Sequence, residues 1–201
     1  MRHPSHGPLD DYLTIFMLDV KYLTRSISVA NAEFDVKGLY DALDERRRSR
    51  AMRWAAVRRE MNARFQEVPG HKPIAMSTIT GLQNKRNVEG DGILQMLLWL
   101  GRTPESFLPG FEEADAERFR LPQLGKEQIL RWDTRAIHSA LNAEREARGM
   151  SWKEVANDIG VGSANPLTNL AKGGRTGFPG VMRIVVWLGR PAATFTRASD
   201  W

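Results

Sequence analysis

Cysteine is absent from the 201-residue sequence. Its absence excludes disulfide bonds, thiolate nucleophiles and cysteine-ligated zinc or iron–sulfur sites, and it is consistent with a reducing compartment. Long hydrophobic runs are lacking too: the longest near the start, residues 15–18, falls far short of the roughly 20 residues that a membrane span needs, and no signal-peptide cleavage pattern follows it. We therefore expect a cytoplasmic protein without a membrane segment.

Patterns that indicate catalysis or metal binding are also missing. The four histidines, His3, His6, His71 and His138, are scattered, and none has metal-ligand spacing to another histidine or to a pair of carboxylates. The glycine-rich stretch 173–177 lacks the spacing and the following Lys-Ser/Thr of a phosphate-binding loop, so we interpret it as a turn that ends a helix. We expect no metal, no cofactor and no enzymatic activity.

Positive charge exceeds negative charge. Lysine and arginine total 29 against 24 acidic residues, which gives a net charge of +5 and an isoelectric point near 9.8. Such a balance favours an acidic partner such as nucleic acid. Residues 46–59 contain no acid and hold seven arginines: Arg46, Arg47, Arg48, Arg50, Arg53, Arg58 and Arg59. A solvated helix face is the plain alternative explanation for this cluster.

The sequence contains an internal repeat. Residues 34–43 run parallel to 132–141, and 52–54 to 150–152, at an offset of 98; farther on, 79–82 match 167–170, and 99–102 match 187–190, at an offset of 88. The first copy therefore carries ten extra residues between about 62 and 76. Four matched blocks in the same order indicate a duplication.

Each copy has the signals of several short helices. Asp35 and Asp133 stand where an N-cap carboxylate accepts the first free backbone amides, and each precedes apolar residues at i and i+4 spacing. Ser151 with Glu154 three residues later forms a capping box. Residues 181–188 are almost wholly apolar and predict a buried closing helix. Sustained strand alternation is not seen, so we expect an all-α fold.

Residues 150–161, followed by 167–173, resemble the helix-turn-helix of phage-repressor-type (XRE, Cro-like) transcription regulators. Ala156 is small enough for two helices to cross closely, and Gly160 supplies the positive φ of the turn. The resemblance covers 150–190 well and 39–102 more loosely. It implies two tandem lambda-repressor-like helix-turn-helix units and a protein that binds DNA.

The chain departs from this family in both copies. Pro166 stands at the head of the second copy's recognition helix, which we expect to begin near residue 164 or 165, since proline is tolerated in a first turn. In the first copy Arg58 replaces the small Ala156, and the ten-residue insertion separates the two helices. Whether the first copy binds DNA is therefore left open.

The predicted organisation has four parts. Residues 1–33 form an N-terminal extension, 34–107 the first unit with its insertion at 62–76, 108–131 a linker rich in proline, glycine and charge, and 132–201 the second unit. Periodicity does not decide between helix and strand in residues 1–33. This segment is either an extra element packed on the first unit or an arm for a homodimer or another protein partner.

Both copies offer polar side chains for base readout together with cations for phosphates. The second copy supplies Ser163, Asn165, Thr168, Asn169, Lys172 and Arg175, and the first supplies Ser77, Thr78, Thr80, Gln83, Asn84, Lys85 and Arg86. That any exposed short helix is polar is the plain alternative. Tryptophan recurs at matched positions 54, 152, 99 and 187, which predicts a role in the core rather than in base stacking.

Two functions follow from these patterns. The first is sequence-specific binding of double-stranded DNA by a transcriptional regulator of the repressor type, in which both copies contact one site made of two unlike half-sites. The alternative is a protein-interaction module, such as an antitoxin-like partner, that uses residues 1–33 and one degenerate repeat.

Overall fold

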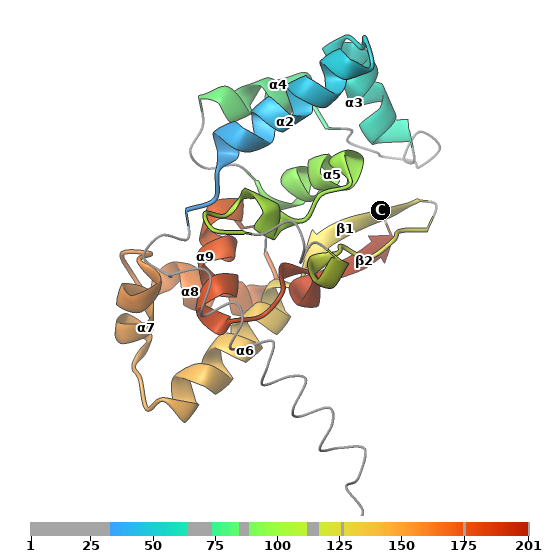
Figure 1. The fold of residues 1–201 in the computed structure, drawn as a ribbon. Helices are drawn as coiled ribbons and strands as arrows, with labels where there is room; N and C mark the ends of the chain where they lie inside the picture. Colours follow the sequence, from blue (N-terminus) through green and yellow to red (C-terminus); the bar gives the residue numbers. More distant parts are fainter. Residues whose placement is uncertain are drawn as a thin grey trace, which may run out of the picture.

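The two copies fold into the same order of elements in a computed structural model, which describes residues 33–63, 74–84, 89–111, 117–125, 127–174 and 176–200. The first copy contains α2 (Val36–Ser49), α3 (Trp54–Asn62), α4 (Met76–Thr80), the 3-10 turn η3 (Gly81–Gln83), α5 (Gly90–Leu100) and η4 (Pro104–Phe107). The second contains α6 (Thr134–Ala147), α7 (Trp152–Ile159), α8 (Asn165–Asn169), η6 (Leu170–Lys172), α9 (Phe178–Leu188) and η7 (Ala192–Phe195) (Figure 1). The protein is mostly helical, as expected.

The predicted N-caps are confirmed in both copies. The Asp35 carboxylate accepts a hydrogen bond from the Gly38 amide at 2.7 Å, and the Asp133 carboxylate accepts one from the Ala136 amide at 2.9 Å. The capping residues also donate: the amide of Asp35 binds the carbonyl of Phe107, and the amide of Asp133 binds that of Phe195. Each copy thus ties the start of its first helix to its last turn, which extends the repeat through Phe107 and Phe195.

The turn after α7 forms as its sequence predicts. Ser151 and Glu154 make the reciprocal capping box at the start of the helix, and Gly160 ends it in the left-handed conformation at φ +75°. Helix α8 begins at Asn165 with Pro166 in its first turn. At the corresponding place in the first copy stands Asn62, whose side chain accepts from the Ile74 amide at 2.7 Å and donates to its carbonyl. Asn62 therefore closes the base of the insertion.

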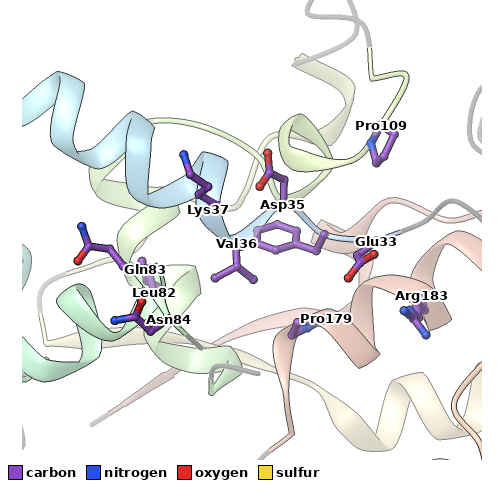
Figure 2. A pocket seen from close by; sticks show the side chains of 11 residues that line it. Glu33, Asp35, Val36, Lys37, Leu82, Gln83, Asn84, Pro109, Pro179 and Arg183 are labelled. Atoms are coloured by element: carbon purple, nitrogen blue, oxygen red, sulfur yellow. The ribbon is translucent and has the colours of Figure 1, made fainter. Parts of the chain in front are cut away.

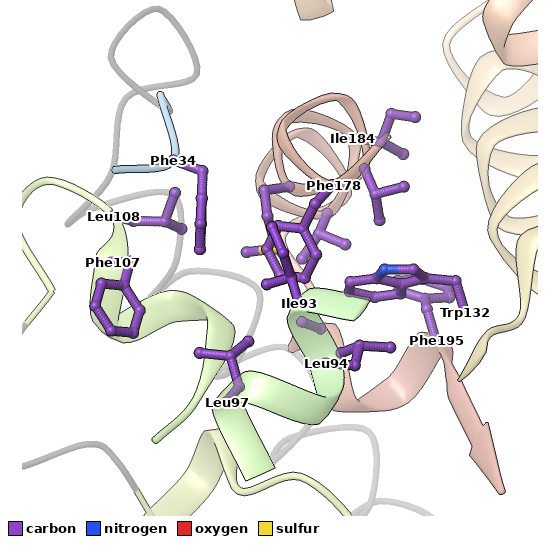
Figure 3. Packing of buried hydrophobic residues seen from close by; sticks show 14 of the residues in the cluster. Phe34, Ile93, Leu94, Leu97, Phe107, Leu108, Trp132, Phe178, Ile184 and Phe195 are labelled. Carbon is purple, nitrogen blue, oxygen red and sulfur yellow. The ribbon is translucent and has the colours of Figure 1, made fainter. Parts of the chain in front are cut away.

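Helices α5 and α9 pack against each other at the centre of the molecule (Figure 1). Both are apolar around most of their circumference; Ile93, Leu94 and Leu97 in α5, like Val181 and Val185 in α9, are fully buried. A helix that is apolar all round must be covered on all sides. Each closing helix is covered by its own copy on one side and by the other copy on the other, so the two copies share one core (Figure 3).

A two-stranded sheet corrects the expectation of an all-α fold. Strand β1 (Gln128–Trp132) pairs antiparallel with β2 (Thr196–Asp200), with Gln128 opposite Asp200 and Trp132 opposite Thr196. Residues 108–131, which composition indicated as a linker, contain most of β1 and several buried side chains, including those of Leu121 and Leu130. The Leu130 carbonyl also accepts a hydrogen bond from the Gln95 side chain at 3.1 Å. This stretch is therefore attached to the first copy's closing helix.

Two glycines should respond in opposite directions to alanine. Gly160→Ala places a Cβ at φ +75° and should lower the free energy of unfolding by about 1 kcal/mol. Gly180→Ala lies in α9 where a Cβ meets nothing within 4 Å, and it should raise that free energy by about 0.5–1 kcal/mol. Urea unfolding of both variants measures the difference. Equal effects would contradict the conformation assigned to Gly160.

Candidate nucleic-acid interface

The second polar segment, residues 163–172, stands on two buried leucines. Leu167 is 0% and Leu170 5% exposed, so they fix α8 and η6 to the core. Ser163, Asn165 and Asn169 are exposed on the other side of the segment. Hydrogen-bonding groups that project from an anchored short helix have the arrangement needed to meet base edges in a groove.

Two further positions frame this segment. Lys172 is exposed at its end, where a cation can meet a phosphate. Thr168 is half-buried, and its hydroxyl donates to the carbonyls of Ala164 and Asn165 at 3.4 and 3.2 Å. A hydroxyl engaged in its own helix is less available to a ligand, so the asparagines are the stronger candidates for readout. Arg175 lies outside the described residues.

The first polar segment, residues 76–84, repeats this arrangement. Ile79 and Leu82, at 0% and 2% exposed, take the places of Leu167 and Leu170. Four of the predicted residues are exposed, namely Ser77, Thr80, Gln83 and Asn84, whereas Thr78 is half-buried. The Thr80 hydroxyl donates to the Met76 carbonyl at 3.2 Å. Lys85 and Arg86 lie outside the described residues.

Arg58 does not disturb the first copy, although it replaces Ala156 in the repeat. Ala156 is 1% exposed, whereas Arg58 is exposed to solvent. Helix α3 instead buries Val57 and Met61. The first copy therefore needs no small residue at this position, and it places its polar segment without one.

Much of the basic stretch is engaged within the protein. Arg46 donates to the Leu100 carbonyl, Arg48 pairs with Asp44, and Arg50 forms a two-pronged ion pair with Glu60 at 2.7 and 2.8 Å. The Arg50 guanidinium and the Trp99 indole, which both donate to Glu60, hold the pKa of that carboxyl below its usual range. Hydrogen bonds to a carboxylate favour its charged form.

Arg47 has a structural role that the repeat preserves in Arg145. Arg47 donates to the Met52 carbonyl at 2.9 Å and lies over the Trp54 ring at 5.1 Å; Arg145 donates to the Met150 carbonyl at 3.0 Å and lies over the Trp152 ring at 5.2 Å. Four arginines of the stretch therefore have partners within the protein, namely Arg46, Arg47, Arg48 and Arg50. The other three, Arg53, Arg58 and Arg59, are exposed, and the described residues provide no ion pair for them.

The recurring tryptophans contribute to packing. Trp187 is 5% exposed, and Trp54, Trp99 and Trp152 are half-buried against the shared core. Arginines from matched positions lie over two of these rings: the Arg50 guanidinium is 5.9 Å from the centre of the Trp99 ring, and the Arg148 guanidinium is 4.4 Å from the centre of the Trp187 ring. Cation–π contacts of this kind are worth about 0.5–1 kcal/mol at exposed sites. This placement agrees with the predicted role of the tryptophans in the core.

A cleft of about 800 Å³ lies between the two copies (Figure 2). Its walls are the first turn of α2, the end of η3 with Gln83 and Asn84, and the start of α9 with Pro179 and Arg183. Arg183 donates at 2.8 Å to the carbonyl of Gly160, the residue at the turn before the second polar segment. The end of the first polar segment thus lines the cleft, and Arg183 on its wall is bonded to the turn that precedes the second segment.

Glu105 is a buried carboxyl at the junction of the two copies, and no sequence signal indicated it. It lies in η4, is 0% exposed, and accepts a hydrogen bond from the backbone amide of Ala192 in η7 at 2.6 Å. Burial raises the pKa of Glu105 to about 7, and the Ala192 amide opposes part of that rise. In sequence, an acid after a proline at the start of a turn is indistinguishable from an exposed helix-end charge.

Other kinds of site are not indicated by the described residues. They hold no group of three or more histidine, aspartate or glutamate side chains placed to bind a metal ion. None of the helices formed by them has both the length and the apolar character required to cross a membrane. No protein-family model, curated protein or solved structure matches the chain.

The buried Glu105 should make folding pH-dependent. Because its folded-state pKa of about 7 lies above the usual 4.5, the folded state binds the proton more tightly than the unfolded state does. The stabilisation from the protonated Glu105 is therefore fully present below pH 4.5. It is lost as the pH rises through 7, which lowers the free energy of unfolding by about 3 kcal/mol. Glu105→Gln should remove this part of the pH dependence in urea unfolding at pH 5 and pH 8. An unchanged pH dependence in that variant would contradict the assignment.

Proposed function

We propose that the protein is a sequence-specific double-stranded DNA-binding protein that acts as a transcriptional regulator. The observation that carries the proposal is the duplication of one arrangement: a polar segment anchored by two buried apolar residues, with hydrogen-bonding side chains outward, in both copies. The positive net charge and the resemblance of residues 150–190 to XRE-type regulators support the same function.

The two polar segments are the proposed recognition segments. In the second, Asn165 and Asn169 meet base edges, because asparagine pairs with adenine through two hydrogen bonds in the major groove. Lys172 meets phosphate, which fixes orientation without reading sequence. In the first, Ser77, Gln83 and Asn84 have the corresponding role. Binding through this surface needs neither a metal nor a cofactor, and we propose no enzymatic activity.

Duplex binding should depend steeply on salt. If about six phosphates are contacted, affinity should fall by roughly three orders of magnitude between 50 and 200 mM salt, because counterions released from DNA oppose binding. Fluorescence anisotropy with random and genomic duplexes measures this dependence. Salt-insensitive binding, or none at 50 mM salt, would rule out the proposed function.

Asn169 and Lys172 should differ in the kind of affinity they provide. Asn169→Ala should lose about 1–3 kcal/mol of binding free energy on the preferred sequence and little on random duplex. Lys172→Ala should weaken all sequences alike and reduce the salt dependence by about one phosphate. Ser139→Ala, an exposed substitution in α6, is the matched control. Wild-type affinity and preference in both test variants would show that α8 and η6 do not contact DNA.

A further inference from the structure

We infer that the two copies face each other across a local two-fold axis, so that one chain binds an inverted pair of unlike half-sites without a second chain. The part of this inference that concerns DNA rests on the proposed function. The two-fold relation itself rests on three contacts between the copies, and it is testable without DNA.

The first contact joins equivalent residues. Glu89 and Gly177 occupy the same position in the two copies, and they form an antiparallel β-bridge with each other. Beside it the Gly90 amide donates to the Thr176 carbonyl at 3.0 Å. When a residue pairs antiparallel with its own equivalent, a two-fold axis passes between the two. Self-complementary contact is the mark of a two-fold interface, whereas a head-to-tail interface joins different patches.

The second contact is made by two equivalent pairs of residues, which differ in the sizes of their side chains. Phe34 and Trp132 are equivalent residues, as are Gly90 and Phe178. Phe34 packs on α9, the closing helix of the second copy, and Trp132 packs on α5, the closing helix of the first. The rings of Phe34 and Phe178 lie 4.5 Å apart, and a Cβ on Gly90 would stand 2.5 Å from Trp132 Cδ1. On one side of the axis Phe34 thus meets the Phe178 ring, and on the other side Trp132 occupies the space that a side chain at position 90 would need, while its ring also packs against Phe178 at 5.5 Å. Figure 3 shows Phe178 between Phe34 and Trp132.

The third contact joins the last turns of the two copies. Glu105 of η4 accepts from the amide of Ala192 in η7, and the residues equivalent to these two are their immediate chain neighbours, Ala193 and Pro104. The matching turns therefore meet each other, as a two-fold axis requires. In the second contact, the Trp132 ring leaves no room for a Cβ at position 90, so this residue must be glycine.

The axis determines how DNA is approached. A rotation that exchanges the copies also exchanges the two proposed recognition segments, 76–84 and 163–172. Two-fold-related recognition helices read half-sites in opposite orientations, because the duplex backbone has the same local symmetry. The segments differ in side chains, so the half-sites are inverted in orientation and unlike in sequence. The closing helices are buried against each other, so this interface is occupied within one chain.

Selection from random duplexes, followed by native mass spectrometry of the intact chain on the selected site, tests the DNA part. We expect two dissimilar half-sites in inverted orientation, one helical turn or a multiple of it apart, and one chain per duplex. Half-sites in direct orientation, a single half-site, or two chains per site would overturn the inference and leave the proposed DNA binding intact. No enrichment, together with no duplex binding, would overturn the proposed function and the DNA part with it.

Two substitutions that exchange side-chain sizes between positions 90 and 132 test the two-fold relation without DNA. Gly90→Phe should lower the melting temperature by about 5 °C or more, because it forces a ring into Trp132. Adding Trp132→Phe recreates the pair that Phe34 and Phe178 form across the axis, so the double variant should recover part of the loss, although the Thr176 carbonyl still stands 3.1 Å from the new Cβ. If Gly90→Phe does not fold, recovery of folding in the double variant gives the same answer. Additive losses, or a double variant no better than Gly90→Phe, would overturn the two-fold relation.

Discussion

The structure depends on the burial of two helices that neither copy can cover alone. Helices α5 and α9 are apolar around most of their circumference, and each copy brings helices to only part of that surface. The residues that precede each copy's first helix, Phe34 and Trp132, cross to the other copy's closing helix. Fully burying one large apolar side chain is worth about 1.5–3 kcal/mol. Several such side chains lie at the junction, where the two copies share one core.

This junction also explains features outside it. Strand β1 is held against α5 by the Asp91–Arg131 ion pair at 2.9 Å and by the Gln95 hydrogen bond, so residues 128–132 are extended rather than helical. The polar segments lie outside the junction, each fixed by its own buried apolar pair. Core and proposed recognition surface are therefore separate, and substitutions in one need not affect the other.

The features that sequence predicted are those determined by neighbouring residues. Asp35, Ser151 and Gly160 act within one turn of themselves, so capping and turn chemistry are visible in the sequence, and the apolar run at 181–188 indicates its own burial. The repeat was visible because matched residues have matched roles, as Arg47 and Arg145 later showed.

The features that sequence did not predict depend on distant partners. Strand β2 is polar and β1 is not alternating, so neither had a strand pattern, and their pairing joins residues far apart in the chain. Glu105 and Arg46 looked exposed because their partners, Ala192 and Leu100, lie elsewhere in the sequence. The arginine cluster consequently contributes less free charge than its composition indicated.

The proposed function requires residues 76–84 and 163–172 to form one surface that binds DNA. Hydrogen–deuterium exchange of the intact chain, with and without its selected duplex, detects such a surface, because it measures protection of the backbone segment by segment. We expect slower exchange in both segments when the duplex is bound, with little change in α6. Protection confined to other parts of the chain, with both segments unchanged, would contradict it.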